Sequence, residues 1–263
     1  MFFRAHFVLT SLILLSMGSA HGIVQITQTF EVGEDTSDWG SEWVAPAGYD
    51  GDAPTFLDES LGGFQAGEGI SAVGQEAYRE FKNNTAGLDL TQAYSMSMYL
   101  QLDFGVDPPA SGNFSISNGD YGANAGQIRL SGSESSGNID WTATDYGSSL
   151  VDLGINLIFN TPYLVIFDID PVAQTYAVTV SRVNAAGVVQ ETGSASGLAI
   201  DPSVFVNEQY GKLLFHVDAS AGDVDFFVDN IDISSAVPEP SALATVFGLS
   251  ALLCVSRRRR PLN

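Results

Sequence analysis

The stretch Tyr163–Val183, YLVIFDIDPVAQTYAVTVSRV, decides the fold of this chain. Residues 163–170 and residues 175–183 alternate between apolar and polar side chains, which is the period of a strand with one buried face. The proline-led segment 171–174 between them is short and is typical of a turn. The stretch therefore predicts an antiparallel hairpin, which residues 187–192 can extend.

Similar period-two runs, separated by Gly, Asn, Asp and Ser, recur through the chain, and no long helical pattern appears. Residues 31–74 are predicted to be loop-like, and residues 201–210 to hold at most a helical turn. Further strands are expected at residues 23–30, 93–104, 113–117, 127–131, 138–142, 212–218 and 225–234, of which the last two are expected to pair. Roughly ten short strands in one block predict an all-β domain, a two-sheet sandwich or jelly roll over residues 21–236.

The first twenty residues are predicted to be a secretory signal peptide. Arg4 supplies the positive start, and residues 7–17 form the apolar centre. The small residues that follow favour cleavage after Ala20. Export through the Sec machinery is therefore expected, and an uncleaved membrane anchor is the alternative.

The last 27 residues, 237–263, consist of three parts that differ in composition. An extended Val-Pro-Glu-Pro tetrad comes first, and an uncharged apolar run at 241–256 follows it. A helix of that length spans roughly 24 Å, less than the hydrocarbon core of about 30 Å, so it makes a marginal transmembrane helix. Arginines after it hold the end in the cytoplasm. The residues of this signal are Val237, Pro238, Glu239, Pro240, Arg257, Arg258, Arg259 and Arg260.

The order of these parts resembles the PEP-CTERM sorting signal of Gram-negative bacteria. The resemblance implies that an exosortase, a membrane-embedded cysteine transpeptidase-like enzyme, removes the tail near Pro238, Glu239 and Pro240. It also implies transient anchoring in the inner membrane and delivery to the cell envelope, outer surface or extracellular matrix, with exopolysaccharide and biofilm. An ordinary C-terminal anchor is the alternative, and the resemblance leaves the fold of residues 21–236 open.

The composition of the chain is strongly acidic. It holds 31 Asp and Glu against 10 Lys and Arg, for a formal net charge of −21, and five of the basic residues lie in the two terminal segments. Such a body repels polyanions, so nucleic acid is excluded as a partner. The single cysteine, Cys254, lies in the apolar tail, which excludes disulfides and cysteine metal sites from the body. His216 is expected to be a structural strand residue.

Several segments of the body resemble concanavalin A-like lectin and laminin G-like jelly rolls. The matching pieces are YREF at 78–81, SMSMY at 95–99, LVIF at 164–167, TYAVT at 175–179 and VDNID at 228–232. The resemblance implies a jelly roll over residues 23–234 and carbohydrate binding as its role. A galactose-binding-like jelly roll is the rival fold.

Candidate catalytic carboxylates occur in two pairs. Glucanases on this fold place a Glu-x-Asp-x-x-Glu set on one face of a strand. Asp168 with Asp170 and Asp223 with Asp225 are pairs that lack the third carboxylate, and no nucleophile elbow or phosphate loop is present. A non-enzymatic protein is therefore expected, and a glucanase-like, glycan-degrading enzyme is the alternative.

Two further sets of side chains are candidate ligand contacts. The acidic turn at 218–225 offers calcium the oxygens of Asp218, Asp223 and Asp225, and a plain polar turn is the preferred interpretation of the same residues. Sugars stack on exposed aromatic rings, and the aromatics most expected to be partly exposed are Trp39, Trp43, Trp141 and Tyr146. The sequence thus predicts an exported, acidic β-sandwich that binds glycans or serves as a matrix component.

Overall fold

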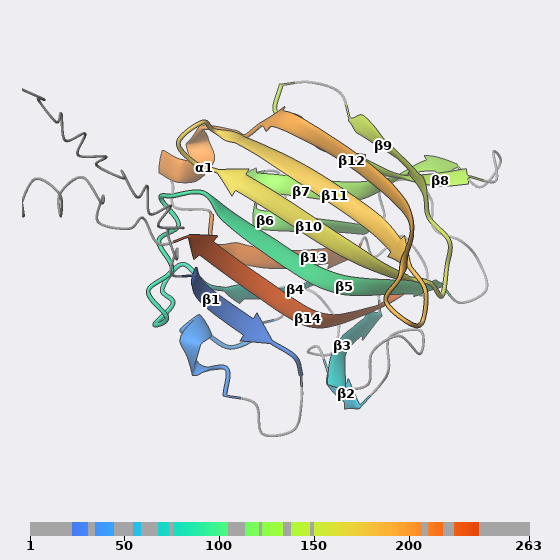
Figure 1. Ribbon diagram of the computed structural model, residues 1–263, viewed down its shortest axis with the longest axis horizontal. Helices are drawn as coiled ribbons and strands as arrows, with labels where there is room; N and C mark the ends of the chain where they lie inside the picture. Colours follow the sequence, from blue (N-terminus) through green and yellow to red (C-terminus); the bar gives the residue numbers. More distant parts are fainter. Residues whose placement is uncertain are drawn as a thin grey trace, which may run out of the picture. The chain divides into compact units, whose positions relative to one another are not determined.

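The computed structural model describes residues 23–30, 35–44, 55–58, 68–73, 76–104, 114–120, 123–133, 138–147, 150–206, 210–217 and 224–236. Two antiparallel sheets dominate these residues and pack face to face (Figure 1). The predicted all-β, two-sheet sandwich is thereby confirmed. Within the described residues, no helix has the length and apolar character needed to cross a membrane. The predicted signal peptide and the C-terminal sorting signal lie outside them.

The larger sheet, sheet A, has the strand order β12-β11-β10-β5-β14-β3-β2, and β1 also pairs with β14. Its strands are β1 (Ile23–Gln28), β2 (Thr55–Asp58), β3 (Glu68–Val73), β5 (Tyr94–Phe104), β10 (Pro162–Asp170), β11 (Thr175–Val183), β12 (Val189–Ala199) and β14 (Val224–Ala236). A bulge between Asp229 and Asp232 divides β14, with β3 paired on one side of it and β1 on the other. Asn230 within the bulge has a φ of 50°, a conformation that asparagine tolerates better than most residues.

The smaller sheet, sheet B, has the order β4-β13-β6-β7-β8-β9 and lies behind sheet A in Figure 1. Its strands are β4 (Glu76–Glu80), β6 (Phe114–Asp120), β7 (Ala123–Ser133), β8 (Asn138–Ala143), β9 (Val151–Asn156) and β13 (Lys212–Val217). The described helical turns are the 3-10 turn η1 (Ser37–Trp39) and α1 (Ser203–Val206). The latter falls within the segment predicted to hold a helical turn.

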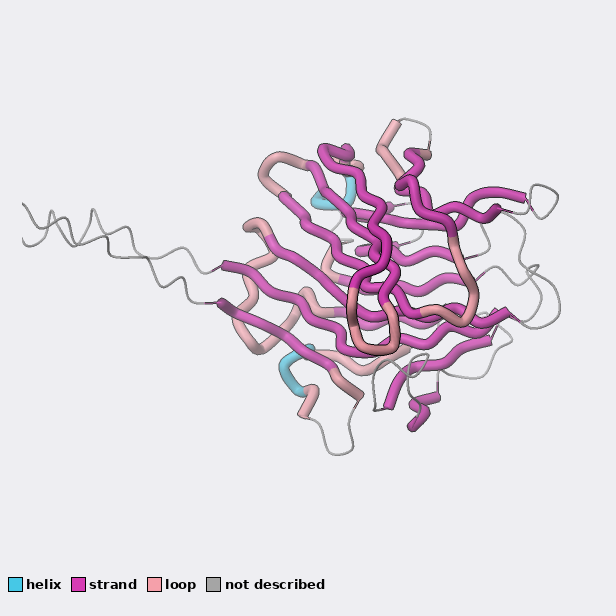
Figure 2. The backbone as a smooth tube through the Cα atoms, turned by 45° about the vertical axis from the view of Figure 1, so that its right-hand side comes forward, coloured by secondary structure: helices cyan, strands magenta, loops and turns pink. Residues whose placement is uncertain are grey.

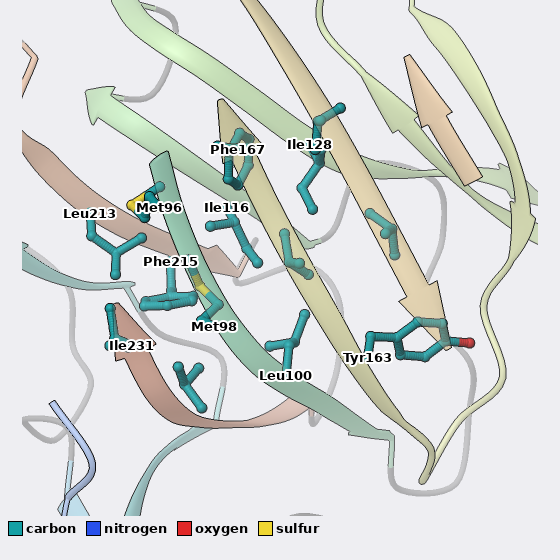
Figure 3. Packing of buried hydrophobic residues seen from close by; sticks show 14 of the residues in the cluster. Met96, Met98, Leu100, Ile116, Ile128, Tyr163, Phe167, Leu213, Phe215 and Ile231 are labelled. Atoms are coloured by element: carbon teal, nitrogen blue, oxygen red, sulfur yellow. The ribbon is translucent and has the colours of Figure 1, made fainter. Parts of the chain in front are cut away.

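Alternate side chains of both sheets meet in one apolar core. Met96, Met98 and Phe167 from sheet A face Ile116 and Phe215 from sheet B, and all are buried (Figure 3). Each fully buried side chain of this size contributes about 1.5–3 kcal/mol relative to exposure. The same alternation turns every second residue of each strand away from the core, and those residues form the outer faces of the two sheets.

The hairpin predicted from Tyr163–Val183 is confirmed. Strands β10 and β11 pair from Tyr163 opposite Arg182 to Asp170 opposite Thr175, and β12 continues the sheet beyond β11. The carboxylate of Asp170 accepts hydrogen bonds from the backbone N–H groups of Val172 and Ala173, at 3.0 and 2.9 Å. A strand-end aspartate therefore fixes the turn that joins the two strands.

The predicted pairing of residues 212–218 with residues 225–234 is wrong. Strand β13 lies between β4 and β6 in sheet B, whereas β14 lies in sheet A beside β5. The two strands lie close together in the sequence, and both segments have the pattern of a strand. Such a pattern predicts which side chains are buried, but it does not predict which strand is the partner. Residues 31–74, predicted to be loop-like, also include β2 and β3.

The two ends of the described chain lie side by side. Ile23 at the start of β1 is paired with Ala236 at the end of β14 (Figure 2). The chain therefore enters and leaves this sandwich at the same end of sheet A. Ser234 and Ser235, just before the exit, are part of the site described next.

Candidate functional site

A groove of about 500 Å³ lies across sheet A, between β14 and β12. Ser95, Asp168, Thr175 and Ser234 supply most of its polar side chains, and Gly197 on β12 closes one side. Its volume is within the range of about 300–1,000 Å³ that is common for ligand sites. The groove lies on the outer face of sheet A, since Met96 and Phe167, which are the neighbours of Ser95 and Asp168 along their strands, are buried in the core.

Strand register places the polar side chains of the groove in one straight row. Ser234 is opposite Ser95, Ser95 is opposite Asp168, and Asp168 is opposite Ala177. Directly opposed residues have Cβ atoms about 4.5–5.5 Å apart, so four strands present this row as a continuous strip. A ligand lying across the strands would meet two hydroxyls and a carboxylate in succession.

The two aspartates of the predicted catalytic pair both line the groove, but they differ in their contacts. Asp168 is exposed and makes no hydrogen bond or ion pair with another described residue. Asp170 has one carboxylate oxygen engaged by the turn after β10. Asp168 is therefore the carboxylate that is available to a ligand, and Asp170 has the structural role of a turn carboxylate.

Two tyrosines that line the groove are held in the neutral form. Burial raises the pKa of Tyr94 and of Tyr176 well above the usual tyrosine value. Tyr94 accepts a hydrogen bond of 2.7 Å from Asn118 Nδ2, and Tyr176 donates one of 3.1 Å to the carbonyl of Gln127. Among the described residues that line the groove, none is basic, and Asp168 and Asp170 are the acidic ones.

Beyond the groove, the outer face of sheet A becomes less polar. Ile166 and Leu164 on β10 are half-buried, and Tyr99 on β5 is opposite Leu164. Tyr99 was not among the predicted sugar contacts. The alternation of Tyr99 with buried Met98 and Leu100 could have identified it as an outward-facing aromatic.

The predicted exposure of the tryptophans is wrong for two of the three. Trp39 and Trp141 are 0% exposed. The Trp39 ring packs edge-on against Phe81 and its Nε1 donates to the carbonyl of Thr27 at 3.1 Å, which leaves no surface for a sugar in this conformation. Trp141 packs edge-on against two further buried aromatic rings. Trp39 and Trp141 are therefore core residues and not sugar contacts.

The other two predicted aromatics keep some surface. Trp43 is half-buried, and its Nε1 donates to Gln28 Oε1 at 3.0 Å. Tyr146 is 53% exposed, and its N–H donates to the carbonyl of Ala199 at 3.0 Å. Neither lines the groove on sheet A. His216, expected to be a structural strand residue, is 8% exposed on β13.

The remaining predicted sites fall outside the described residues. These are the cleavage site at Ala20, the sorting signal at 237–263, and the calcium ligands Asp218 and Asp223 together with the side chain of Asp225. In the part of the chain that the structure describes, no three His, Cys, Asp or Glu side chains gather as a metal site would require. The calcium site therefore stays a prediction.

No protein-family model matches this chain, and no curated protein resembles it in sequence. A carbohydrate esterase from the Shiga toxin-encoding bacteriophage phi24B has a similar fold, with a TM-score of 0.54 and 12% identity over 82% of this chain and 100% of that one. A protein of unknown function from Shewanella oneidensis MR-1 aligns with a TM-score of 0.49 and 14% identity, over 83% and 88% of the two chains. Domain 4 of the GH43 arabinanase AbnA from Geobacillus stearothermophilus, solved with arabinotriose, gives 0.45 and 12%, over 84% and 96%. At these identities, the likeness to the phage protein concerns the fold.

Proposed function

We propose that the outer face of sheet A binds a glycan and that the protein is exported and sorted by its tail to the cell envelope or extracellular matrix. The observation that carries the binding proposal is the groove with Asp168 at its centre. The similar fold of the phage carbohydrate esterase supports the choice of ligand class. No catalytic role is proposed for the groove, because Asp170 is committed to the turn.

The chemistry of the face suits a sugar chain. Hydroxyls of Ser95 and Ser234 donate and accept hydrogen bonds, and the Asp168 carboxylate accepts them from sugar hydroxyls. The half-buried Ile166, Leu164 and Tyr99 further along the face offer contact to the apolar side of a sugar ring. Polar groups fix the orientation of such a ligand and apolar ones provide contact area.

The sorting part of the proposal depends on the terminal segments. Pro238-Glu239-Pro240, the apolar run 241–256 and four arginines have the order of an exosortase substrate. The enzyme and the Sec machinery would be transient partners, and the membrane would hold the chain through residues 241–256 before processing. After tail removal the sandwich would reach its final location as an exported matrix or envelope component.

A binding screen tests the proposed ligand class. The full chain, purified in detergent, is applied to a glycan array, and hits are measured again with Asp168→Asn and with Asp140→Asn. Asp140 is a partly exposed carboxylate on sheet B, so the control removes the same charge far from the groove. We expect Asp168→Asn to weaken binding about tenfold, as loss of one charge-assisted hydrogen bond does, and Asp140→Asn to leave it unchanged.

Two results would change this conclusion. Absence of binding to any glycan, or equal effects of the two variants, would contradict a sugar site in the groove. Turnover of a β-glucan that Asp168→Asn abolishes would instead support the enzymatic alternative.

A further inference from the structure

Arg129 on β7 stands apart from the other basic residues of the body. Residues 21–236 contain only five Lys and Arg, against a large excess of Asp and Glu. Lys82 lies 4.0 Å from Glu80, Arg182 lies 3.0 Å from Glu191, and Lys212 lies 4.0 Å above the Tyr78 ring. Arg79 is buried, and its guanidinium donates hydrogen bonds to Gln28 Oε1 and to the carbonyl of Ser41. Arg129 has no carboxylate, aromatic ring or hydrogen-bond acceptor for its guanidinium among the described residues, and its Nε is buried without a partner.

The position of Arg129 makes this isolation informative. It projects from the outer face of sheet B, since Ile128 and Leu130 on either side are buried in the core. Strand register sets it between Ser115 on β6 and Thr142 on β8. The arginine is therefore held near the middle of the sheet, flanked by two hydroxyl side chains, while the whole residue remains only partly buried.

Two neighbours of Arg129 also carry polar groups without partners. Ser115 is 1% exposed, and its Oγ makes no hydrogen bond with a described residue. Gln127, two residues before Arg129 on the same face of β7, is 4% exposed. Its Oε1 accepts from Thr144 Oγ1 at 3.0 Å, but its Nε2 is buried and has no acceptor among the described residues.

The three unpaired groups have complementary chemistry. Arg129 Nε and Gln127 Nε2 can only donate, and the Ser115 hydroxyl can donate as well. A buried donor without an acceptor is costly, and such groups in a native protein call for a partner such as an ion or water. Three donors in adjacent positions of β6 and β7 thus lack an oxygen acceptor. The arginine adds a positive charge, which favours an anionic acceptor.

We propose that the outer face of sheet B binds an oxyanion, a carboxylate or sulfate group, through Arg129, Ser115 and Gln127. The planar guanidinium suits such a group because it can donate two parallel hydrogen bonds to it. The acidic body repels long polyanions, so the site takes one isolated anionic group, such as the carboxylate of a single acidic sugar or an inorganic ion. This site lies on the other sheet from the groove and does not depend on the glycan proposal.

The Arg129 Nε–H signal in a nitrogen–proton NMR spectrum tests this directly. The full chain in detergent is titrated with sodium sulfate, with glucuronate, and with glucose as the neutral control. Comparison with Arg129→Gln assigns the signal. We expect sulfate or glucuronate to shift it at millimolar concentrations and glucose to leave it unchanged. A response to both anions identifies a general oxyanion site, and a response to glucuronate alone identifies an acidic sugar.

Variants give a second readout in the same titrations, followed as an anion-induced rise in melting temperature. Arg129→Gln should abolish the rise, Ser115→Ala should weaken apparent affinity about threefold, and Arg182→Gln should keep it as in the wild type. Without anion, Ser115→Ala should melt no lower than the wild type because it removes an unpaired hydroxyl. A wild-type Nε–H signal that stays unchanged up to tens of millimolar anion would overturn the proposal, as would an equal response in Arg129→Gln.

Discussion

Replacing Arg79 by methionine should be among the most destabilising single changes in the sandwich. Arg79 on β4 is 1% exposed. Its guanidinium donates to the carbonyl of Ser41 at 3.0 and 2.8 Å, to the carbonyl of Thr36 at 3.1 Å and to Gln28 Oε1 at 2.6 Å. It also lies 4.6 Å above the Trp39 ring. One side chain thus fastens residues 35–44 to β1 and β4.

The expected loss follows from the acceptors that methionine leaves behind. Methionine keeps much of the apolar volume against Trp39, so the main loss is electrostatic and hydrogen-bonded. The Ser41 carbonyl loses its donor, at about 1–3 kcal/mol for an acceptor left unpaired. The Thr36 carbonyl and Gln28 Oε1 each lose a charged donor and keep a neutral one, the Trp39 N–H and the Trp43 Nε1. Ser41 and Thr36 are only partly buried, so water can replace part of the loss at their carbonyls. The free energy of unfolding should therefore fall by about 3–5 kcal/mol.

Thermal unfolding of the full chain in detergent, followed by circular dichroism, measures this effect. A domain of this size loses roughly 2–4 °C of melting temperature per kcal/mol, so Arg79→Met should melt roughly 6–20 °C lower. Arg79→Lys should lose less, because it keeps the charge but not the planar set of donors. Arg182→Met is the matched control, since its partner Glu191 is exposed and such pairs contribute only about 0–1 kcal/mol. Equal losses in Arg79→Met and Arg182→Met would refute the argument.

Three further outcomes are expected. Burial raises the pKa of Tyr94 and Tyr176, so the unfolded state alone ionises them above its own pKa of about 10. The stability that they contribute is complete below about pH 10, and above it the free energy of unfolding falls by about 1.4 kcal/mol per pH unit for each tyrosine. In denaturant titrations at increasing pH, Tyr94→Phe should therefore show a shallower fall than the wild type. Replacing residues 238–240 with alanine should leave the protein exported but unprocessed and membrane-held, whereas deleting residues 237–263 should release it. Intact mass and cell fractionation in a host that carries an exosortase measure both outcomes. If the alanine variant is trimmed like the wild type, the tail is only a membrane anchor. If the turn at 218–225 binds calcium, millimolar calcium should raise the melting temperature relative to chelator, and identical melting curves would remove that site.

Local pattern predicted the strands well where it could. The segments at 93–104, 163–170 and 175–183 were each predicted to within a residue or two, because burial on one face forces alternation in the sequence. Strand β9 was not predicted, and Gly154 in its centre, with a φ of 73°, interrupts the pattern of VDLGIN. The pairing of β13 with β4 and β6 depends on contacts distant in sequence, which no local pattern records.

The candidate sites were predicted in part for the same reason. Asp168 stood out because two aspartates occupy one face of a strand, and the structure places it in the groove. Ser95 and Ser234, its companions in the row, come from strands far away along the chain, so only the register of the sheet brings them to Asp168. Arg129 carried no signal, since a lone arginine in an acidic sequence predicts an ion pair more readily than an isolated cation.

The alternation that builds the core also separates the two proposed sites. Asp168 and Arg129 point away from the core on different sheets, and packed sheets are about 10 Å apart, so the two side chains cannot contact one ligand group together. Mutations separated by more than about 7–10 Å without shared partners have additive effects. Asp168→Asn should thus leave the anion response intact, and Arg129→Gln should leave glycan binding intact. A single shared binding event would require both variants to lose both responses, which distinguishes one site from two.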